Sequence, residues 1–269
     1  MTTAIAVHGA SGRMGRSVIE VLASDIDAEL VAAIDRAGHA AIGQDAGVLV
    51  GTKKPLGVLV SDDLRAAIER SQVVIDFSSP EASMGVIARC VASKRAAVIG
   101  TTGLDSACHE AIDALARVAP VVVAPNFSIG VSVLVALAGY AAQMLGEQFD
   151  IEIVEMHHRN KVDAPSGTAV RLTEVVARAR GLDPEWATVM GRSGRPGPRP
   201  PSEIGVHALR GGDVIGDHTV MLAGPGERIE LTHRAHERQI FARGAVRAAH
   251  WVATQAPGRY DMSDVIGIR

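Results

Sequence analysis

Short apolar runs alternate with helix-like stretches through the first half of the chain. The runs are almost continuously apolar, which is typical of strands buried on both faces of a sheet. Between them, apolar residues recur at helical spacing. Such repeated strand–helix units predict a parallel sheet with right-handed crossovers, and therefore a doubly wound α/β domain. The strand-like runs are residues 4–7, 30–34, 58–60, 73–77, 97–99 and 121–124, and the helical stretches are residues 12–24, 62–70, 80–93 and 105–117.

The pattern changes in the second half of the chain. Apolar and polar residues alternate in four runs, and Gly224-Pro225-Gly226 supplies a tight turn between the last two. One helix, from Ser166 to Gly181, interrupts these strands, so we expect a second α+β domain with a mixed four-stranded sheet. Residues 191–205 hold four Gly, four Pro and three Arg and predict a long mobile loop. A last helix, at residues 238–254, could belong to either domain. The alternating runs are residues 151–156, 206–209, 219–223 and 228–232.

The composition is that of a soluble globular protein. The 269 residues are 47% hydrophobic and 21% charged, enough for one large domain or two ordinary ones. A formal charge of −3 without a basic block, and only 3% aromatic residues, argue against a nucleic-acid partner. Two cysteines, Cys90 and Cys108, are too few for a disulfide framework or a four-thiolate zinc site and indicate a reducing compartment. Residues 1–15 lack the pattern of a secretory signal, so we expect a cytoplasmic protein.

One stretch is apolar enough to be considered as a membrane span. Residues 129–145 carry no charge, but they number only 17 and include Ser132 and Gln143. That length lies at the short edge of the spanning range. We therefore expect a helix buried inside a soluble fold and no membrane association.

A glycine-rich turn, Gly9-Ala10-Ser11-Gly12-Arg13-Met14-Gly15, follows the first strand-like run. Glycines in such a turn let the main chain approach a pyrophosphate, whose charge the helix N-terminus favours. Asp35 ends the next strand 35 − 15 = 20 residues after the last glycine, where an acid accepts hydrogen bonds from a ribose. Arg36 could instead pair with a 2′-phosphate. The alternative is a glycine turn that serves only strand–helix packing.

Two further loops follow later strands of the same sheet. They are Gly100-Thr101-Thr102-Gly103 and Ala124-Pro125-Asn126-Phe127-Ser128. Open α/β sheets bind ligands at the carboxyl ends of their strands, where both loops are expected. Each alone is more often an ordinary turn, but together they predict cofactor contacts.

The most informative segment is a cationic loop between a strand and a helix in the second half. It contains His157, His158, Arg159 and Lys161, and it runs into a helix that begins Ser166-Gly167-Thr168. Main-chain N–H groups and hydroxyls at a helix N-terminus form a seat for anions. Histidine titrates near neutral pH and can donate a proton. The segment predicts a site for a small, doubly negative substrate.

Other interpretations of this segment remain open. The paired histidines could bind zinc, but no third ligand stands at a usual spacing, and adjacent side chains on a strand point apart. The cations could form a solvated surface. Any single histidine is more often structural than catalytic.

Taken with the rest of the chain, these motifs resemble the 4-hydroxy-tetrahydrodipicolinate reductase (dihydrodipicolinate reductase) family. The similarity runs through GASGRMG, GTTG, APNFS, EMHHRNKVDAPSGTA, HALRGGDVIGDHTV and GERIELTHRA, and so covers nearly the whole chain. It implies NAD(P)H-dependent reduction of the cyclic substrate to tetrahydrodipicolinate in the diaminopimelate route to lysine. It also implies a Rossmann-like domain at residues 1–127 and a substrate-binding and oligomerisation domain at 128–237. Residues 238–269 would return to the first domain, and the protein would be a homotetramer.

The resemblance also implies roles for individual residues. His157 would be the proton donor, and Lys161 a second donor that also holds the substrate. His158, Ser166, Gly167 and Thr168 would bind the substrate. The cofactor, NADH or NADPH, would be surrounded by Gly9, Ala10, Ser11, Gly12, Arg13, Met14, Asp35, Arg36, Gly100, Thr101, Thr102, Ala124, Pro125, Asn126 and Phe127.

Three other functions are considered beside this one. A different semialdehyde or imine dehydrogenase would oxidise the same cofactors with other acids. A nucleotide-sensing protein would bind cofactor without turnover, although His157, Lys161 and the Ser166-Gly167-Thr168 segment argue against it. A metal-dependent hydrolase would lose activity to chelators.

Overall fold

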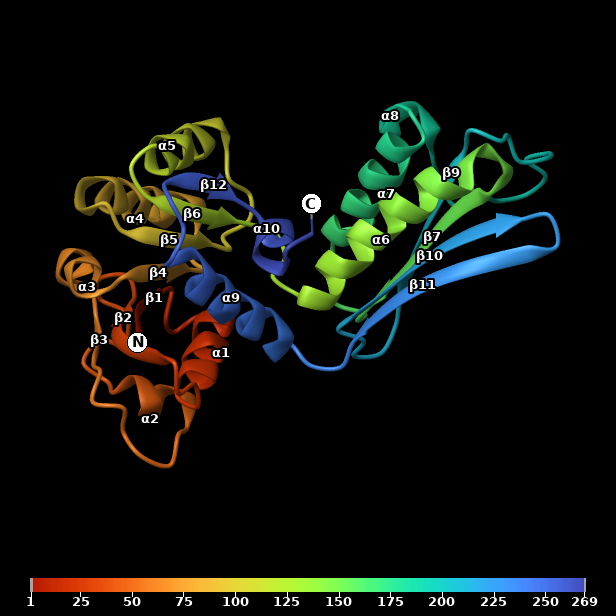
Figure 1. The fold of residues 1–269 in the computed structure, drawn as a ribbon. Helices are drawn as coiled ribbons and strands as arrows, with labels where there is room; N and C mark the ends of the chain where they lie inside the picture. The colour runs from red at the N-terminus through yellow and green to blue at the C-terminus, as the bar shows by residue number, and fades with distance from the viewer. Residues whose placement is uncertain (1, 269) are drawn as a thin grey trace. The chain divides into compact units, whose positions relative to one another are not determined.

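The computed structural model describes residues 2–268, and the chain divides into two compact units (Figure 1). Unit 1 contains the chain up to Ile129 together with the residues from Gln239 on. Unit 2 is Gly130–Arg238. The last long helix, α9 (Gln239–Val252), therefore belongs to the same unit as the N-terminal strands.

Unit 1 is built on a seven-stranded sheet in the order β12-β6-β5-β4-β1-β2-β3, with every pair parallel. Successive residues of one strand enter cores on opposite faces: Ile5 and Val7 pack on one side and Ala6 on the other. The almost continuously apolar runs of the sequence are thus explained. The strands are β1 (Thr3–His8), β2 (Ala28–Ile34), β3 (Val60–Ser61), β4 (Val73–Asp76), β5 (Ala96–Ile99), β6 (Pro120–Val123) and β12 (Gly258–Tyr260).

Several helices of unit 1, though not α1 (Arg13–Leu22), begin where a side chain accepts hydrogen bonds from their first N–H groups. Ser79 caps Ala82 of α4, and Asp105 caps Cys108 of α5. Sequence patterns predicted the four helices of the strand–helix units but not α2, α10 or strand β12, whose five, five and three residues are too short for a periodic signal. The remaining helices are α1 (Arg13–Leu22), α2 (Ala46–Val50), α3 (Leu64–Arg70), α4 (Pro80–Ser93), α5 (Ser106–Ala116) and α10 (Met262–Ile266).

Unit 2 is built on a mixed sheet in the order β11-β10-β7-β9-β8. Strand β10 is antiparallel to β7 and β11, whereas β9 is parallel to β7 and β8. The predicted fold class is confirmed, but this sheet has five strands instead of four because the three-residue strand β8 adds at its edge. The strands are β7 (Asp150–His157), β8 (Thr188–Met190), β9 (Ile204–Arg210), β10 (Gly216–Gly224) and β11 (Glu227–Ala235).

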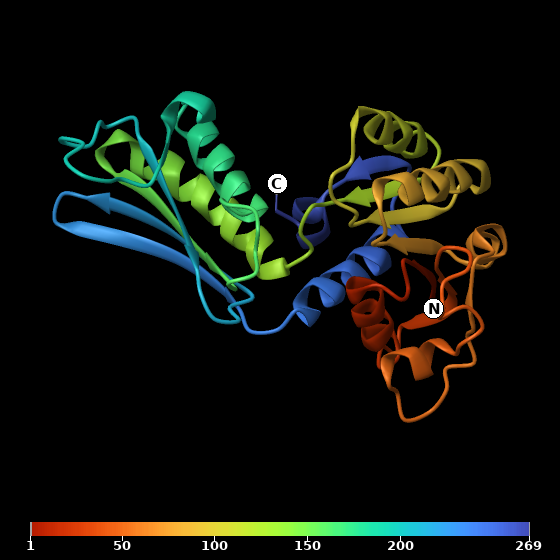
Figure 2. The same cartoon turned by 180° about the vertical axis from the view of Figure 1, so that it is seen from behind.

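Two long helices cover one face of the unit 2 sheet, as Figures 1 and 2 show from opposite sides. Leu134 of α6 (Ile129–Leu145) and Leu172 of α7 (Gly167–Ala179) enter one core with Ile153 of the sheet. The turn of 3₁₀ helix at Gly146–Gln148 and the short α8 (Pro184–Ala187) complete the unit.

Helix α6 is less buried than the helix inside a soluble fold that its sequence predicts. Together with the following turn it is long and apolar enough to cross a membrane, by length and composition alone, and 22% of that window is buried. Ala138 and Ala142 face the core, whereas Leu137, Tyr140 and Met144 are exposed. Only one side of the helix is therefore covered within this chain.

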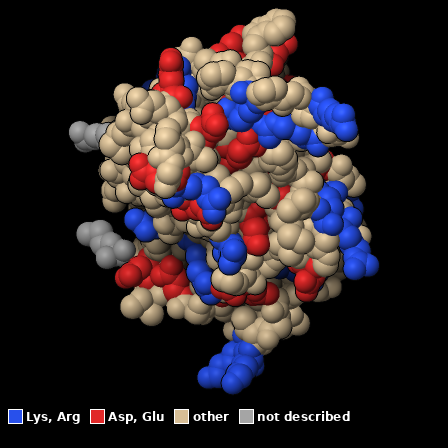
Figure 3. Space-filling view, turned by 90° about the vertical axis from the view of Figure 1, so that its right-hand side faces the viewer, with Lys and Arg blue, Asp and Glu red and all other residues tan. Residues whose placement is uncertain are grey.

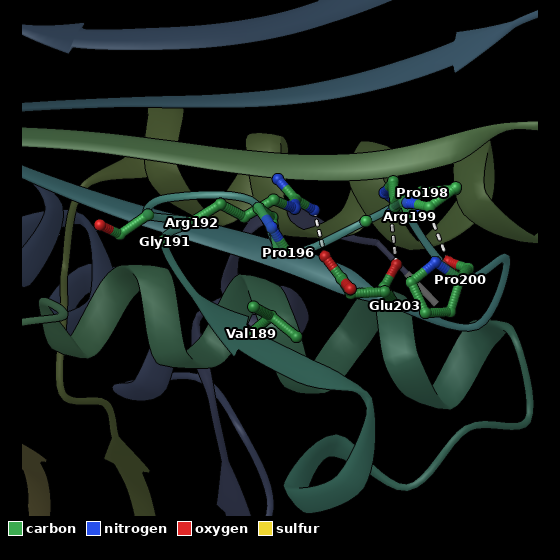
Figure 4. Close-up of a pocket in the computed structure, with 10 residues that line it drawn as sticks. Val189, Gly191, Arg192, Pro196, Pro198, Arg199, Pro200 and Glu203 are labelled. Atoms are coloured by element: carbon green, nitrogen blue, oxygen red, sulfur yellow. Dashed lines mark hydrogen bonds and ion pairs between the residues drawn. The ribbon is translucent and has the colours of Figure 1, made fainter.

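The loop predicted at residues 191–205 has no helix or strand over residues 191–203, but its last two residues belong to β9, which begins at Ile204. Arg192 and Arg199 both pair with Glu152 of β7. Arg192 also pairs with Glu203, as Figure 4 shows. Residues of this loop, with Val189, line a small cavity of about 170 Å³. Arg192 and Arg199 are thus neutralised by carboxylates, and Figure 3 shows acidic and basic side chains interspersed on the face it draws.

Candidate active site

The glycine-rich turn of unit 1 joins β1 directly to α1. Gly9 has φ +76, and a Cβ on Gly15 would lie 2.1 Å from the Gly9 carbonyl oxygen, so the turn requires glycine at both positions. The N-cap residue of α1, Gly12, provides no side-chain cap, and the first turn contains no acidic residue. The N-terminus of α1 can therefore receive an anion such as a phosphate.

Asp35 follows β2 and is bound to this turn. Its Oδ2 accepts hydrogen bonds from Ser11 N at 2.8 Å and from Ser11 Oγ at 2.5 Å. Burial would raise the pKa of Asp35, but the hydrogen bonds from Ser11 and from Arg36 N outweigh it and hold that pKa below its usual range. The carboxylate therefore stays ionised beside the turn and can accept hydrogen bonds.

A cavity of about 460 Å³ opens beside the glycine-rich turn, lined by residues from the loops after β4, β5 and β6 as well as by α1 and α9. Within it, the rings of Phe77 and Phe127 meet edge to face at 5.6 Å. Eight residues expected at a cofactor line the cavity, namely Arg13, Met14, Gly100, Thr101, Thr102, Pro125, Asn126 and Phe127. Phe77, Ser78 and Phe241 also line it, although no sequence motif pointed to them.

A buried ionic cluster forms the centre of the site in unit 2. Glu155 is 0% exposed, and its Oε2 lies 2.6 Å from His157 Nδ1. Arg210 of β9 binds both oxygens of the same carboxylate, at 2.8 and 2.9 Å. Burial would raise the pKa of Glu155, but Arg210 and His157 hold it below its usual range. The carboxylate is therefore an anion at neutral pH, neutralised by the guanidinium.

His157 ends β7 and is nearly buried, with its ring edge-to-face against His218 at a centroid distance of 5.1 Å. Burial lowers the pKa of His157 more than Glu155 raises it, and the charges of Lys161 and Arg210 lower it further. Since Nδ1 donates to Glu155, Nε2 is the ring nitrogen that remains to exchange a proton.

Lys161 and His158, two other expected site residues, have partners outside the Glu155 cluster. Lys161 Nζ lies 2.8 Å from each oxygen of Asp163, and His158 Nε2 lies 3.3 Å from Arg238 Nη2. Within the part of the chain from 2 to 268, no group of three or more potential metal ligands occurs.

Ser166 fixes the start of α7. Its N–H donates to Glu155 Oε1 at 3.0 Å, and its hydroxyl accepts from Ala169 N and contacts His218 Nε2 at 3.0 Å. A Cβ on Gly167 would meet nothing within 4 Å, so the first turn of α7 opens onto free space. A ligand anion has room to reach the main chain there.

Sequence reasoning assigned no role to Glu155, Arg210, Asp163 or His218. Glu155 could have been found, because a residue two before His157 on a strand points to the same face. Arg210 could not, because it reaches the cluster only through the parallel register that places it opposite His157.

Comparisons with known proteins point to one family. The family model for the N-terminus of dihydrodipicolinate reductase matches residues 3–127, and the model for its C-terminus matches residues 130–266. The chain belongs to the dihydrodipicolinate reductase family. The 4-hydroxy-tetrahydrodipicolinate reductases of Alkalilimnicola ehrlichii and Thiobacillus denitrificans are 54% and 51% identical to it, each over 100% of both chains.

Solved structures extend the comparison. A dipicolinate-bound dihydrodipicolinate reductase from Paenisporosarcina sp. TG-14 is 26% identical, with a TM-score of 0.79 over 99% of this chain and 100% of that one. An amine dehydrogenase from Mycobacterium smegmatis shares the fold, with a TM-score of 0.61 and 15% identity over 96% of this chain and 94% of that one.

The dihydrodipicolinate reductase family uses NADH or NADPH. The chain is a soluble NAD(P)H-dependent oxidoreductase of lysine biosynthesis that reduces 4-hydroxy-tetrahydrodipicolinate to tetrahydrodipicolinate.

Proposed function

We propose that the two units divide the reaction between them. Residues 1–127, with 238–269 returning to the same unit, bind the dinucleotide, and residues 128–237 bind the substrate. The glycine turn, the ionised Asp35 and the cavity of about 460 Å³ support the first assignment. The cluster around His157 supports the second, and it is the observation on which the proposal depends.

The cofactor site follows from the turn and the cavity. The pyrophosphate lies at the N-terminus of α1, and the adenosine ribose lies at Asp35, with the exposed Arg36 available to a 2′-phosphate. The residues that surround the dinucleotide in this proposal are Gly9, Ala10, Ser11, Gly12, Arg13, Met14, Asp35, Arg36, Gly100, Thr101, Thr102, Ala124, Pro125, Asn126 and Phe127.

The substrate is a small cyclic dicarboxylate. The related reductase that binds dipicolinate, a planar dicarboxylate, supports this class. One carboxylate binds the start of α7 at Ser166, Gly167 and Thr168, where Gly167 faces open space. His158 and Lys161 bind the other, and the Lys161 ammonium exchanges Asp163 for the substrate.

Proton delivery belongs to His157. The 4-hydroxyl group of the substrate leaves as water together with a proton from the neighbouring carbon, which creates a new ring double bond. The nicotinamide, when bound, would supply hydride to one carbon of the resulting conjugated system. The substrate then carries negative charge that a proton must neutralise. His157 donates that proton from Nε2, and Lys161 offsets the substrate's charge and acts as a second donor.

We also propose that the protein is a cytoplasmic homotetramer. Both cysteines, Cys90 and Cys108, are free and buried, which suits a reducing compartment. Analytical ultracentrifugation of the full chain tests the assembly: a monomer at micromolar concentration contradicts it.

Replacing Lys161 tests the substrate site. Lys161→Ala should lower kcat/KM for the substrate roughly 10- to 150-fold, because one hydrogen bond to a charged group is lost. The KM for cofactor should not change. Steady-state assays of nicotinamide oxidation at 340 nm measure both, with the exposed Lys53→Ala in unit 1 as a control expected to match the wild type. A variant that loses only cofactor affinity would remove Lys161 from the substrate site.

A further inference from the structure

We propose that Glu155 is a positioning residue that fixes the orientation of the His157 ring. Nδ1 then donates its hydrogen bond to Glu155, and Nε2 faces the substrate. The inference rests on the proposed role of His157 as proton donor. Glu155 itself touches no substrate in this proposal and acts only through the imidazole.

The strand geometry makes the pair rigid. Glu155 and His157 are two residues apart on β7 and share one face of the sheet, which brings Oε2 to 2.6 Å from Nδ1. The carboxylate is held at both ends, because Arg210 bridges its two oxygens and Ser166 N donates to Oε1 at 3.0 Å. A buried acceptor of this kind selects the tautomer with hydrogen on Nδ1.

The Nε2 side of the ring is kept open by a glycine. A Cβ at Gly216, the first residue of β10, would lie 3.0 Å from His157 Nε2 and 3.4 Å from Cδ2. Any larger residue there would crowd the nitrogen that donates the proton. His218, also on β10, closes the neighbouring side with its ring.

Glu155 is also the anion that favours the protonated ring. The charged or titratable groups facing His157 are Glu155 on the same strand, Arg210 on β9, His218 on β10 and Lys161 in the following loop. Burial lowers the pKa of His218 to about 4, so that ring is neutral in the working pH range. The positive charges of Lys161 and Arg210 disfavour a positive charge on the His157 ring. Removing the carboxylate charge should therefore lower the pKa of His157, because burial and the two cations would then act on the imidazolium without an opposing anion.

The test is the pH dependence of kcat/KM for the substrate in Glu155→Gln. A donor is active when protonated, so the rate falls as pH rises through the pKa of His157. In the variant this fall should move at least about one unit lower, giving roughly tenfold loss on the alkaline side and recovery in acid. The cofactor KM should stay at the wild-type value.

Glu152→Gln is the matched control. Glu152 lies on the same strand and is also a carboxylate shared by arginines and a histidine, Arg192, Arg199 and His207, but it does not touch His157. Its pH profile should coincide with that of the wild type. Equal displacement in both variants would overturn the proposal, because the effect would then be general to the sheet.

Two further results separate this inference from the proposed function. An unshifted profile in Glu155→Gln overturns the positioning role and leaves His157 as donor. Loss of the pH dependence with full activity in His157→Gln overturns the donor role itself. If Glu155→Gln does not fold, ¹⁵N NMR of histidine-labelled wild type decides: hydrogen on Nδ1 of His157 is expected, and hydrogen on Nε2 alone overturns the proposal.

Discussion

Each unit of the chain contains one fully buried carboxylate paired with a histidine, and the two pairs are built differently. In unit 1, His8 Nδ1 lies 2.7 Å from Asp76 Oδ1, and the two residues end neighbouring strands, β1 and β4. In unit 2, His157 and Glu155 come from the same strand. Both carboxylates are 0% exposed.

The remaining partners of the two carboxylates show what each pair does. Among residues 2–268, the side-chain donors to Asp76 besides His8 are neutral, namely the hydroxyls of Ser78, Ser83 and Thr101. Ser78 and Thr101 line the cavity of unit 1, so Asp76 ties the loops after β4 and β5 together. Glu155 is instead neutralised by a guanidinium. A ring of hydroxyls suits a carboxylate that organises loops, and an arginine suits one whose histidine changes charge.

The largest expected difference between the pairs is catalytic. His157→Gln removes the proposed donor and should lower kcat roughly 10²- to 10⁴-fold with little change in cofactor KM. His8→Gln removes a hydrogen bond to Asp76, which contributes about 1.5–3 kcal/mol. Because this bond stabilises the fold and takes no part in proton transfer, kcat should change by less than about tenfold. Comparable losses of kcat in the two variants would mean that both pairs serve the same purpose. Parallel steady-state assays with saturating cofactor measure the contrast.

A second difference is expected in stability. Arg210→Met leaves Glu155 buried without its cation and should cost about 3–5 kcal/mol in the free energy of unfolding. Ser83→Ala removes one of several donors to Asp76 and should cost about 1.5–3 kcal/mol. Hydrogen exchange followed by mass spectrometry assigns each loss to its unit, with β7 reporting on the first and β4 on the second. A smaller loss in Arg210→Met would show that the guanidinium is dispensable.

How far the sequence predicted each unit follows from how local the signals are. The strands and helices of unit 1 repeat a pattern within about 20 to 30 residues, so the doubly wound sheet was predictable. The long α6 was predicted as a helix, but its exposed side was not, because periodicity shows apolar residues without showing what covers them.

The site was predictable to the same extent. The loop containing His157 and Lys161 and the turn at Gly9 are contiguous motifs, and each carries its chemistry within a few residues. The partner that neutralises Glu155 is not contiguous. Arg210 is 210 − 157 = 53 residues from His157, and only the parallel pairing of β7 with β9 brings them together. The edge strand β8, which creates the fifth position in the sheet, is likewise defined by pairing alone.

The smallest expected difference is the response of the two units to acid. Burial, together with the neighbouring His157, lowers the pKa of His218 to about 4, against about 6.5 in the unfolded chain. The unfolded state therefore binds the proton more tightly. The stability contributed by neutral His218 is complete above pH 6.5 and is lost as pH falls toward 4, by at most about 3 kcal/mol.

Carboxylates act in a separate pH window. The arginines and His207 that bind Glu152 hold its pKa at about 2 although burial opposes them, so its contribution is complete above pH 4.5 and is lost only below that. Hydrogen exchange at pH 7 and pH 4.5, corrected for intrinsic rates, should thus show β10 losing protection while β4 of unit 1 keeps it. His218→Gln should remove most of that loss. If β4 loses as much protection as β10, or if the variant behaves like the wild type, the acid sensitivity does not originate in His218. The two units would then differ only in the roles of their carboxylate–histidine pairs and not in their response to acid.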